Sequence, residues 1–271
     1  MTRGDDRQTK QFQLNLSSYI KEEDARRIFA QVFDARAIQA IHKLAMRGLF
    51  ETLEFVISTG KEAHVFRAVD KAGNFRAVKI YKIETSDFKH MEKYVFGDER
   101  FADVKRAKRD LVYAWTKKEY KNLERARKAD VRVPMPISFL DNVLVMEFIG
   151  DEKGEAAPTL KEKGRKVENV EKLHETVVDW FAKLYAKAEM VHADFSEYNI
   201  LINDKELVLI DCGQGVLLNH PNAKEFFERD VRNMAHYLQK LKVETDYDAL
   251  YAEIKERAKK HEKGSNGAKN P

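Results

Sequence analysis

Cysteine is almost missing from this sequence of 271 residues, which contains only Cys212. A single thiol excludes a disulfide within the chain and any zinc site built from several cysteines. Long apolar runs are missing too, since runs such as Val143–Met146 and Leu207–Ile210 have four residues, whereas a membrane-spanning helix needs about 20. The polar first residues, MTRGDDRQTK, lack the apolar core of a signal peptide. We therefore expect an intracellular, cytoplasmic protein without a membrane partner.

A strong net charge is also missing, because 49 lysines and arginines face 45 aspartates and glutamates, which leaves a net charge of +4. A balance this mild does not indicate a nucleic-acid binder unless the basic residues cluster, and we expect no DNA partner. What the chain does have is 43% hydrophobic residues, enough for a folded core rather than general disorder. Its length suits one large domain or two lobes.

Hydrophobic periodicity divides the chain into a helical start, a sheet-rich segment and a largely helical second half. Apolar residues such as Ile28, Val32, Ile38 and Ile41 recur at helical spacing near the N-terminus, and Asp70–Asn74 resembles a hairpin turn. We predict strands at 55–57, 65–68, 76–81, 137–140, 143–148, 200–202 and 207–210, and helices at about 115–129, 170–188, 224–241 and 247–260. The corresponding domains are an N-terminal helical extension (1–50), a first lobe (51–149) with a mobile loop at about 84–110, a second lobe (150–262) and a disordered tail (263–271).

The strongest chemical signal is the segment VHADFSEYN, which contains His192, Asp194 and Asn199 and is followed by Asp211 in LIDCG. An Asp and an Asn five residues apart, with a later Asp after a pair of strands, match the catalytic and metal loops of kinases. Phosphoryl transfer needs a group that accepts the proton of the acceptor hydroxyl, and metal ions that neutralise the phosphate charge. Asp194 fits the first role, and the side-chain oxygens of Asn199 and Asp211 fit the second. Each residue alone is equally explained by a loop, a cap or a strand end, but the three together favour the kinase interpretation. We expect His192 to organise the loop through hydrogen bonds.

A second set of residues lies upstream. Lys79 in AVKI resembles the strand lysine that binds the α- and β-phosphates in kinases, although an amphipathic strand often carries a lysine on its wet face. Its partner should be a carboxylate on the next helix. We choose Glu119, with Glu124 as the fallback, because Trp115 and Leu123 lie one turn on either side of Glu119 and mark an inward face.

The segment STGKEAHVF lies between two predicted strands, where kinases keep a glycine-rich phosphate loop. It has a single glycine, Gly60, which lies 19 residues before Lys79. An ordinary hairpin turn is therefore an equally good interpretation of this segment.

Taken together, these segments resemble a known family. STGKEAHVF, VKIYK, WTKKEYKNL, VPMP, VLVMEFIG, HADFSEYNIL and LIDCGQGV occur in this order and are similar to the RIO family of atypical serine/threonine protein kinases. They are most similar to its first subfamily, in the short archaeal form, over residues 25–240. The resemblance implies an α+β, two-lobed protein-kinase-like fold with additional N-terminal helices.

The resemblance also implies roles for the matching residues. ATP would be held by a phosphate loop, an ion pair and a later strand, comprising Ser58, Thr59, Gly60, Lys61, Glu62, Ala63, Val65, Lys79, Glu119, Met146, Glu147 and Ile149. Met146 would line the adenine pocket, while Glu147 and Ile149 would offer backbone hydrogen bonds to the base. Asp194 would be the catalytic aspartate. Asn199 and Asp211 would bind Mg²⁺, or Mn²⁺, which oxygen ligands of this kind also accept.

The end of the chain is short for a protein kinase. Only 60 residues follow Asp211, and none of them forms the Ala-Pro-Glu motif of ordinary protein kinases. We expect a truncated second lobe without the usual activation loop and peptide-binding helices, a truncation that RIO kinases share. The family is associated with maturation of the small ribosomal subunit. The resemblance implies serine/threonine kinase activity or an ATPase cycle in which Asp211 accepts the phosphoryl group, and Thr85 and Ser86 are candidates for autophosphorylation.

Basic residues do cluster locally. The segment Lys105–Arg132 has eleven lysines and arginines and four acidic residues, and Lys161, Lys163, Arg165 and Lys166 form a second cluster. A pre-ribosomal small-subunit particle and its rRNA are the expected partners, although a solvated helix face explains the charge equally well. Two alternatives stay open, namely a small-molecule phosphotransferase of the aminoglycoside or choline kinase type and a catalytically silent RNA-binding scaffold.

Overall fold

The structure, a computed structural model, describes residues 34–83, 88–164, 166–204 and 206–266. The described chain divides into two compact units. The first contains the residues up to Glu92 together with Val104–Tyr120 and Met135–Ala156, and the second contains Lys93–Asp103, Lys121–Pro134 and the residues from Ala157 onward. These units differ from a division at residue 150, because two earlier segments group with the second unit and residues 150–156 group with the first.

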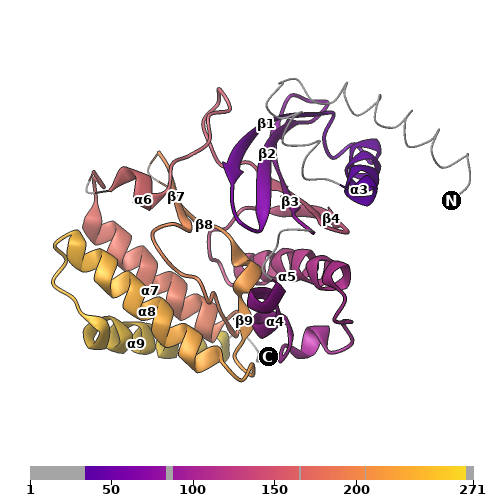
Figure 1. The fold of residues 1–271 in the computed structure, drawn as a ribbon. Helices are drawn as coiled ribbons and strands as arrows, with labels where there is room; N and C mark the ends of the chain where they lie inside the picture. Colours follow the sequence, from indigo (N-terminus) through magenta and orange to yellow (C-terminus); the bar gives the residue numbers. More distant parts are fainter. Residues whose placement is uncertain (1–33, 84–87, 165, 205, 267–271) are drawn as a thin grey trace, which may run out of the picture. The chain divides into compact units, whose positions relative to one another are not determined.

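The first unit is built on a five-stranded antiparallel sheet with the strand order β1-β2-β3-β5-β4 (Figure 1). The strands are β1 (Thr52–Thr59), β2 (Ala63–Val69), β3 (Phe75–Tyr81), β4 (Pro136–Leu140) and β5 (Val143–Glu147). All strands predicted before residue 150 are present, and most are longer than predicted. The hairpin turn between β2 and β3 is confirmed, because Asp70 Oδ1 accepts the N–H groups of Ala72 and Asn74 at 2.9 Å and Gly73 has a φ of 86°.

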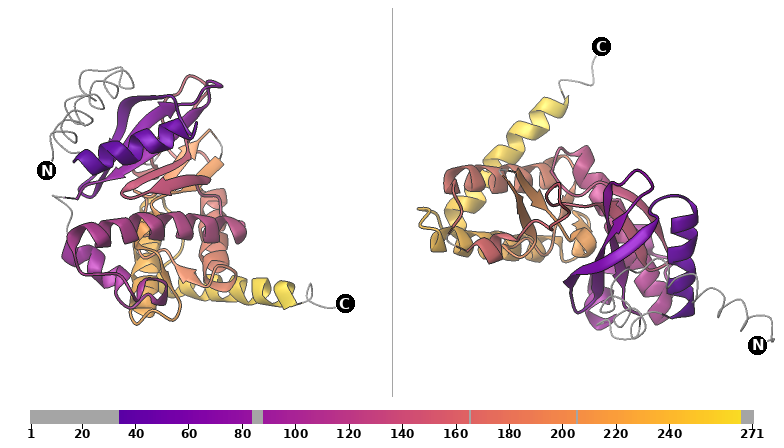
Figure 2. Two further views of the ribbon diagram at one scale, coloured as in Figure 1. Left: turned by 90° about the vertical axis from the view of Figure 1, so that its right-hand side faces the viewer. Right: turned by 90° about the horizontal axis from the view of Figure 1, so that it is seen from above.

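Helix α3 (Ala35–Met46) covers one face of this sheet, as Figure 2 shows. The carboxylate of Asp34 begins the helix by accepting the N–H groups of Arg36 and Ala37. One apolar face of α3 then packs against inward side chains of the strands. The core formed in this way contains Ala37, Ile38, Ala40, Ile41, Leu44, Phe50, Leu53, Phe66, Ala68, Val78, Ile80, Val143 and Val145. Helix α3 corresponds to the last part of the helical stretch predicted before residue 50.

The segment expected to be a mobile loop at 84–110 contains regular structure in its described part. Helix α4 (Phe88–Val95) and the 3-10 turn η1 (Glu99–Phe101) lie within it, and helix α5 (Lys108–Lys128) begins well before its predicted start at Trp115. Met91, Tyr94, Val95 and Phe101 are buried there. The expectation of a loop is wrong in this part because the elements are short and Gly97, with a φ of 106°, interrupts the hydrophobic period.

The second unit consists mainly of helices α7 (Val170–Ala186), α8 (Ala223–Lys240) and α9 (Tyr247–Asn266), which lie side by side (Figures 1 and 2). Its short elements are α6 (Leu160–Lys163), β6 (Met190–Val191), β7 (Ile200–Asn203), β8 (Glu206–Leu209), the 3-10 turn η2 (Cys212–Gln214) and β9 (Val216–Leu217). Strand β6 pairs with β9, and β7 pairs with β8. Elements as short as α6, β6 and β9 escape prediction because they contain too few residues to show a period. Helix α9 continues into the segment that the sequence predicts to be a disordered tail.

Several predicted features lie outside the described residues, namely the helix positions Ile28 and Val32, the phosphorylation candidates Thr85 and Ser86, Arg165 of the second basic cluster and the tail from residue 267. None of the helices in the described part combines the length and the apolar character that a membrane crossing needs.

Candidate active site

Three residues of the first unit that are expected to bind a nucleotide share one face of the sheet. Val65 pairs with Lys79 across β2 and β3, and Ala77, two residues before Lys79, pairs with Met146 across β3 and β5. Successive residues of a strand point to opposite faces, so Val65, Lys79 and Met146 lie together, while Val78 belongs to the core on the other side. The strand register therefore brings together three residues that the family resemblance assigns to ATP binding.

Lys79 and Glu119 form the ion pair that the sequence favours. Lys79 Nζ donates to Glu119 Oε1 at 2.8 Å, and the two residues are 7% and 1% exposed. Glu124, the fallback partner, instead pairs with Lys121 at 3.3 Å on the same helix. Helix α5 thus supplies the carboxylate that fixes the position of the Lys79 ammonium group.

The predicted phosphate loop is a short turn between β1 and β2. The Gly60 N–H donates to the Ala63 carbonyl at 2.9 Å, and residues 58–61 are exposed whereas Ala63 is buried. Lys82, which sequence analysis did not single out, holds this turn, because its Nζ donates to the Gly60 carbonyl at 2.7 Å and its N–H to the Glu62 carbonyl at 2.8 Å. His90 Nδ1 lies 3.2 Å from Glu62 Oε1. The loop is a hairpin turn in shape, so its assignment to phosphate depends on its position.

The end of β5 carries the residues that the family resemblance assigns to the adenine base. The Glu147 N–H donates to the Met135 carbonyl at 2.9 Å, and the Glu147 carboxylate accepts the Met135 N–H at 2.9 Å. A backbone hydrogen bond from Glu147 to a base would therefore have to use its carbonyl oxygen. Ile149 follows the strand, and the chain then turns back through the bridge between Gly150 and Ala156.

In the second unit, Asp194 lies in the loop between β6 and β7 and is held by two amides. Asn199 Nδ2 donates to the Asp194 carbonyl at 2.8 Å and to Asp194 Oδ2 at 2.9 Å, and Gln214 Nε2 donates to the same Oδ2 at 3.1 Å. The five-residue spacing of Asp194 and Asn199 is therefore the spacing of a direct contact. Gln214 was not predicted, although it lies only three residues after Asp211. His192 Nε2 lies 3.1 Å from the Ile210 carbonyl, a contact of the kind expected for a residue that organises the loop through hydrogen bonds.

Asn199 and Asp211 lie at the same end of the β7–β8 hairpin. Asn199 precedes β7, Asp211 follows β8, and the Ile210 N–H donates to the Asn199 carbonyl at 2.9 Å. Because the Asn199 amide nitrogen is committed to Asp194, its side-chain oxygen is the atom that can ligate a cation. Among the described residues no group of three or more His, Cys, Asp or Glu could hold a metal. The two oxygen donors fit Mg²⁺, which protein carboxylates usually share with water and substrate phosphates.

Backbone strain at Ala193 marks a further part of the site. Ala193 has a φ of 63°, a left-handed conformation that costs a non-glycine residue about 1–2 kcal/mol. Asp230 on α8 accepts the Ala193 N–H at 2.7 Å and also the Phe195 N–H, while Arg229 donates to the Ala193 carbonyl. Burial raises the pKa of Asp230 well above its ordinary value, against the opposing effects of these N–H donors and of Arg229. The sequence contains a signal for Asp230, because it lies on the apolar face of α8 among Phe226, Phe227, Val231 and Met234.

We expect Asp230→Ala to destabilise the protein by about 1–3 kcal/mol, because the buried Ala193 N–H loses its acceptor. The strained loop should also lose its geometry, so that kinase activity falls further than the loss of folded protein explains. Thermal unfolding and turnover at a temperature well below the transition measure the two effects. Asn233→Ala, at an exposed position of α8, is the control, and equal effects of the two substitutions would contradict the role of Asp230.

An antiparallel sheet with a buried lysine–glutamate pair, and a hydrogen-bonded Asp and Asn before a hairpin that ends in a second Asp, are features of the protein kinase class. Within this class the chain belongs to the RIO family and is a RIO1-type serine/threonine protein kinase: its sequence matches the RIO domain family over residues 64–250. Because the chain belongs to this family, it is a protein kinase and not a small-molecule phosphotransferase of the aminoglycoside or choline kinase type.

Similar proteins include the RIO-type serine/threonine-protein kinase Rio1 of Haloferax volcanii, which is 43% identical over 93% of this chain and 84% of the relative. Rio1 of Methanocaldococcus jannaschii is 39% identical over 83% of this chain and 76% of the relative. Among solved structures, the Rio2 kinase–ADP/Mg²⁺–phosphoaspartate complex from Chaetomium thermophilum matches with a TM-score of 0.62 and 21% identity, covering 80% of this chain and 65% of that chain. This similarity supports the α+β protein-kinase-like fold predicted from the sequence.

Proposed function

We propose that this kinase transfers the γ-phosphoryl group of ATP, with Mg²⁺, to a serine or threonine hydroxyl or to its own Asp211, and that it acts in maturation of the small ribosomal subunit. The main support for this proposal is the set of hydrogen bonds around the Asp194 carboxylate. The Asp194 carboxylate is oriented by Asn199 and Gln214 and is only partly buried, as suits a group that must reach a substrate proton.

In transfer to a hydroxyl, the bond between the γ-phosphorus and the β,γ-bridging oxygen of ATP breaks and a bond to the hydroxyl oxygen forms. Asp194 accepts the proton of that hydroxyl, and ADP leaves. Lys79, held by Glu119, binds the α- and β-phosphates. Asn199 and Asp211 are the residues that would hold Mg²⁺, which supplies neutralisation of the phosphate charge when bound.

Transfer to Asp211 is supported by the exposure of its side chain and by its position after β8, beside Asn199. The solved Rio2 complex is itself described as containing a phosphoaspartate. In this chain an oxygen of Asp211 would form the bond to phosphorus as ADP leaves. Water would then release inorganic phosphate and restore the carboxylate, which completes an ATPase cycle.

The extent of the second unit supports an acceptor other than a docked peptide. Among the described residues, those after Asp211 form η2, β9, α8 and α9 and no further element. This set agrees with a truncated lobe without the activation loop and peptide-binding helices of ordinary protein kinases. Such a lobe favours acceptors within the chain or within a large assembly.

Exposed basic residues support a ribosomal partner. In the segment 105–132 these are Lys105, Arg106, Lys108, Lys117, Lys121, Arg127 and Lys128, and Lys161, Lys163 and Lys166 are exposed as well. The phosphate backbone of rRNA is a natural partner for basic residues of this density. A ribosomal partner would also place the protein in the cytoplasm.

The test is to incubate the protein with Mg²⁺ and ATP labelled in the γ-phosphate, and then to treat the labelled protein with acid or with hydroxylamine. Label that survives acid lies on serine or threonine, whereas label released by hydroxylamine is an acyl phosphate. Borohydride converts an acyl-phosphorylated aspartate into homoserine with loss of phosphate, so mass spectrometry shows directly whether residue 211 carries the group.

The matched control for Asp211→Asn is Asp204→Asn, since Asp204 is exposed and has a similar left-handed φ of 53°. Absence of both kinds of label and of ATP hydrolysis would refute the proposal.

A further inference from the structure

Asn122 is a polar residue at the centre of a buried helical face. It is 0% exposed, and asparagine is a poor helix former compared with the apolar residues that could fill such a position. A buried amide is tolerated only when its hydrogen-bonding groups find partners. The partners of Asn122 therefore indicate what this residue does.

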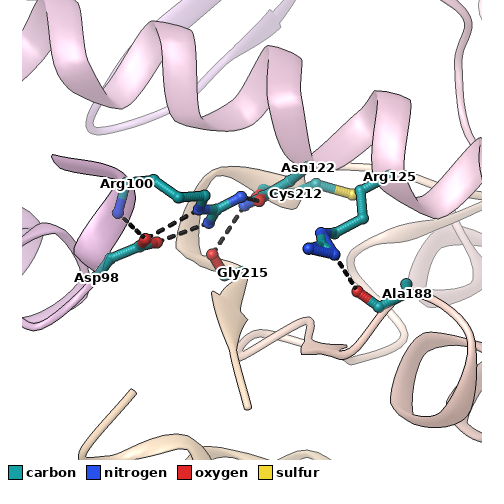
Figure 3. Close-up of polar contacts among 7 residues, drawn as sticks. All are labelled: Asp98, Arg100, Asn122, Arg125, Ala188, Cys212 and Gly215. Atoms are coloured by element: carbon teal, nitrogen blue, oxygen red, sulfur yellow. Dashed lines mark hydrogen bonds and ion pairs between the residues drawn. The ribbon is translucent and has the colours of Figure 1, made fainter. Parts of the chain in front are cut away.

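The Asn122 carboxamide makes three hydrogen bonds, which are drawn in Figure 3. Its Nδ2 donates to the carbonyl of Cys212 and to the carbonyl of Gly215, both at 2.8 Å, and its Oδ1 accepts from Arg100 Nη1 at 2.9 Å. The two carbonyls belong to the first and the fourth residue after Asp211. One side chain is thus hydrogen-bonded to both ends of the turn that follows Asp211, the predicted metal ligand.

These hydrogen bonds stabilise a turn whose first residue, Asp211, has an unfavourable backbone conformation. Asp211 has φ 61° and ψ 60°, the left-handed conformation that costs a non-glycine residue about 1–2 kcal/mol. The closing hydrogen bond of the turn runs from the Gly215 N–H to the Cys212 carbonyl at 3.1 Å. A Cβ at Gly215 would lie 2.9 Å from Asn122 Nδ2 and 2.7 Å from Met190 Cε, so a larger residue at this position would force these side chains to shift.

The orientation of the amide is itself fixed. Arg100 donates from Nε and Nη2 to the two carboxylate oxygens of Asp98 at 2.9 and 2.6 Å, and the Asp98 side chain is fully buried. This two-point pairing holds the guanidinium group rigidly. Since Arg100 can only donate, Asn122 must present its oxygen to Arg100 and its nitrogen to the turn.

We propose that Asn122, oriented by Arg100 and Asp98, is a positioning residue that holds the Asp211–Gly215 turn in the conformation in which the Asp211 carboxylate can act. This inference rests on the proposed function of Asp211 as a metal ligand or phosphoryl acceptor. Asn122 touches neither ATP nor the reacting atoms in this role. It acts through the backbone of the turn, and so its loss should affect the use of Mg²⁺ more than the folding of the chain.

The key variant is Asn122→Asp. The aspartate keeps the shape and the contact with Arg100 but turns an oxygen instead of an amide nitrogen towards two carbonyl oxygens. The matched control is Asn142→Asp, because Asn142 is also buried and its Nδ2 donates to a backbone carbonyl, that of Tyr81 at 2.7 Å. Asn142 lies in the turn between β4 and β5, so a merely structural effect of the substitution is the same in kind at both positions.

The first readout does not require metal or activity. Cys212 is the only cysteine of the chain and is 0% exposed, so its alkylation by iodoacetamide under native conditions reports opening of the turn. We expect Asn122→Asp to raise the alkylation rate by roughly tenfold, the effect of losing two modest hydrogen bonds. Asn142→Asp should leave the rate at the wild-type value. Protection of Cys212 in folded Asn122→Asp equal to that in the wild type would overturn the proposal.

The second readout is the Mg²⁺ concentration that gives half-maximal ATP turnover. We expect it to rise on the order of tenfold in Asn122→Asp with a smaller change in kcat, and to stay unchanged in Asn142→Asp. Faster alkylation with an unaltered Mg²⁺ dependence would reduce Asn122 to a structural role and overturn the positioning role.

Two further variants keep the result interpretable. If Asn122→Asp does not fold, Arg100→Lys keeps a cation beside Asp98 but loses the Nη1 donor, and it should shift both readouts in the same direction by less. If Asp211→Ala has the wild-type Mg²⁺ dependence, the proposed function of Asp211 fails, and the alkylation rates still decide whether Asn122 holds the turn.

Discussion

Replacing Asp194 with asparagine is expected to lower phosphorylation of serine or threonine by roughly 10²–10⁴-fold, the usual contribution of a general base. The structure explains why the effect should be chemical rather than structural. Asp194 Oδ2 accepts hydrogen bonds from Asn199 and Gln214, and the amide oxygen of an asparagine can accept the same two bonds. The variant therefore keeps these two contacts of the loop and loses the charge that is proposed to accept the hydroxyl proton.

The same substitution separates the two possible acceptors. A serine or threonine hydroxyl carries a proton that must be removed, whereas the ionised carboxylate of Asp211 carries none. Asp194→Asn should therefore abolish acid-stable label while hydroxylamine-labile label still forms, and that label should accumulate if Asp194 also activates the water that hydrolyses it. Quantification of both kinds of label over time measures this difference.

Asp204→Asn is the control for this experiment as well, because it makes the same chemical change at an exposed turn of the β7–β8 hairpin. Its labelling should equal that of the wild type. Wild-type levels of acid-stable label in Asp194→Asn would show that Asp194 is not the base.

The parts of the site that could be predicted from the sequence are those whose residues lie in a recognisable motif. Asp194 and Asn199 lie on one loop, and their spacing is set by a direct hydrogen bond. Lys79 and Glu119 are far apart in the sequence, and they were predicted in different ways. Lys79 lies in the motif AVKI, and Glu119 has Trp115 and Leu123 one turn on either side, which mark an inward helix face. Val65 and Met146 were implied by the family resemblance, and the strand register of the structure places them on the same face as Lys79.

The missed residues are those whose role depends on a contact between distant segments. Each of them forms a hydrogen bond with a loop that lies elsewhere in the sequence. They are Lys82, Asn122, Gln214 and Asp230. A polar residue on an otherwise apolar helix face is the signal that could have found Asp230, whereas Asn122 lies one turn from the buried Lys118 and Glu119 and has no such signal. A buried polar residue needs a partner, but the sequence does not say which partner.

Lys79→Met is expected to lower the free energy of unfolding by about 3–5 kcal/mol, because it leaves the buried Glu119 carboxylate without its ammonium partner. Glu119 is 1% exposed and accepts from Lys79 Nζ at 2.8 Å, so water cannot replace the lysine. ATP binding should be lost as well, since the charge that is proposed to bind the phosphates is gone. Chemical unfolding and a nucleotide titration on the same preparation measure the two effects, with Lys71→Met in the exposed β2–β3 turn as the control.

The double variant Lys79→Met with Glu119→Gln separates stability from binding. Removing both charges of a buried pair is often neutral for stability, because neither ion then has to be desolvated. We therefore expect the double variant to regain most of the lost stability and still not bind ATP. A double variant as unstable as Lys79→Met would mean that the ion pair is not the source of the loss, and recovery of ATP binding along with stability would mean that Lys79 acts only through folding.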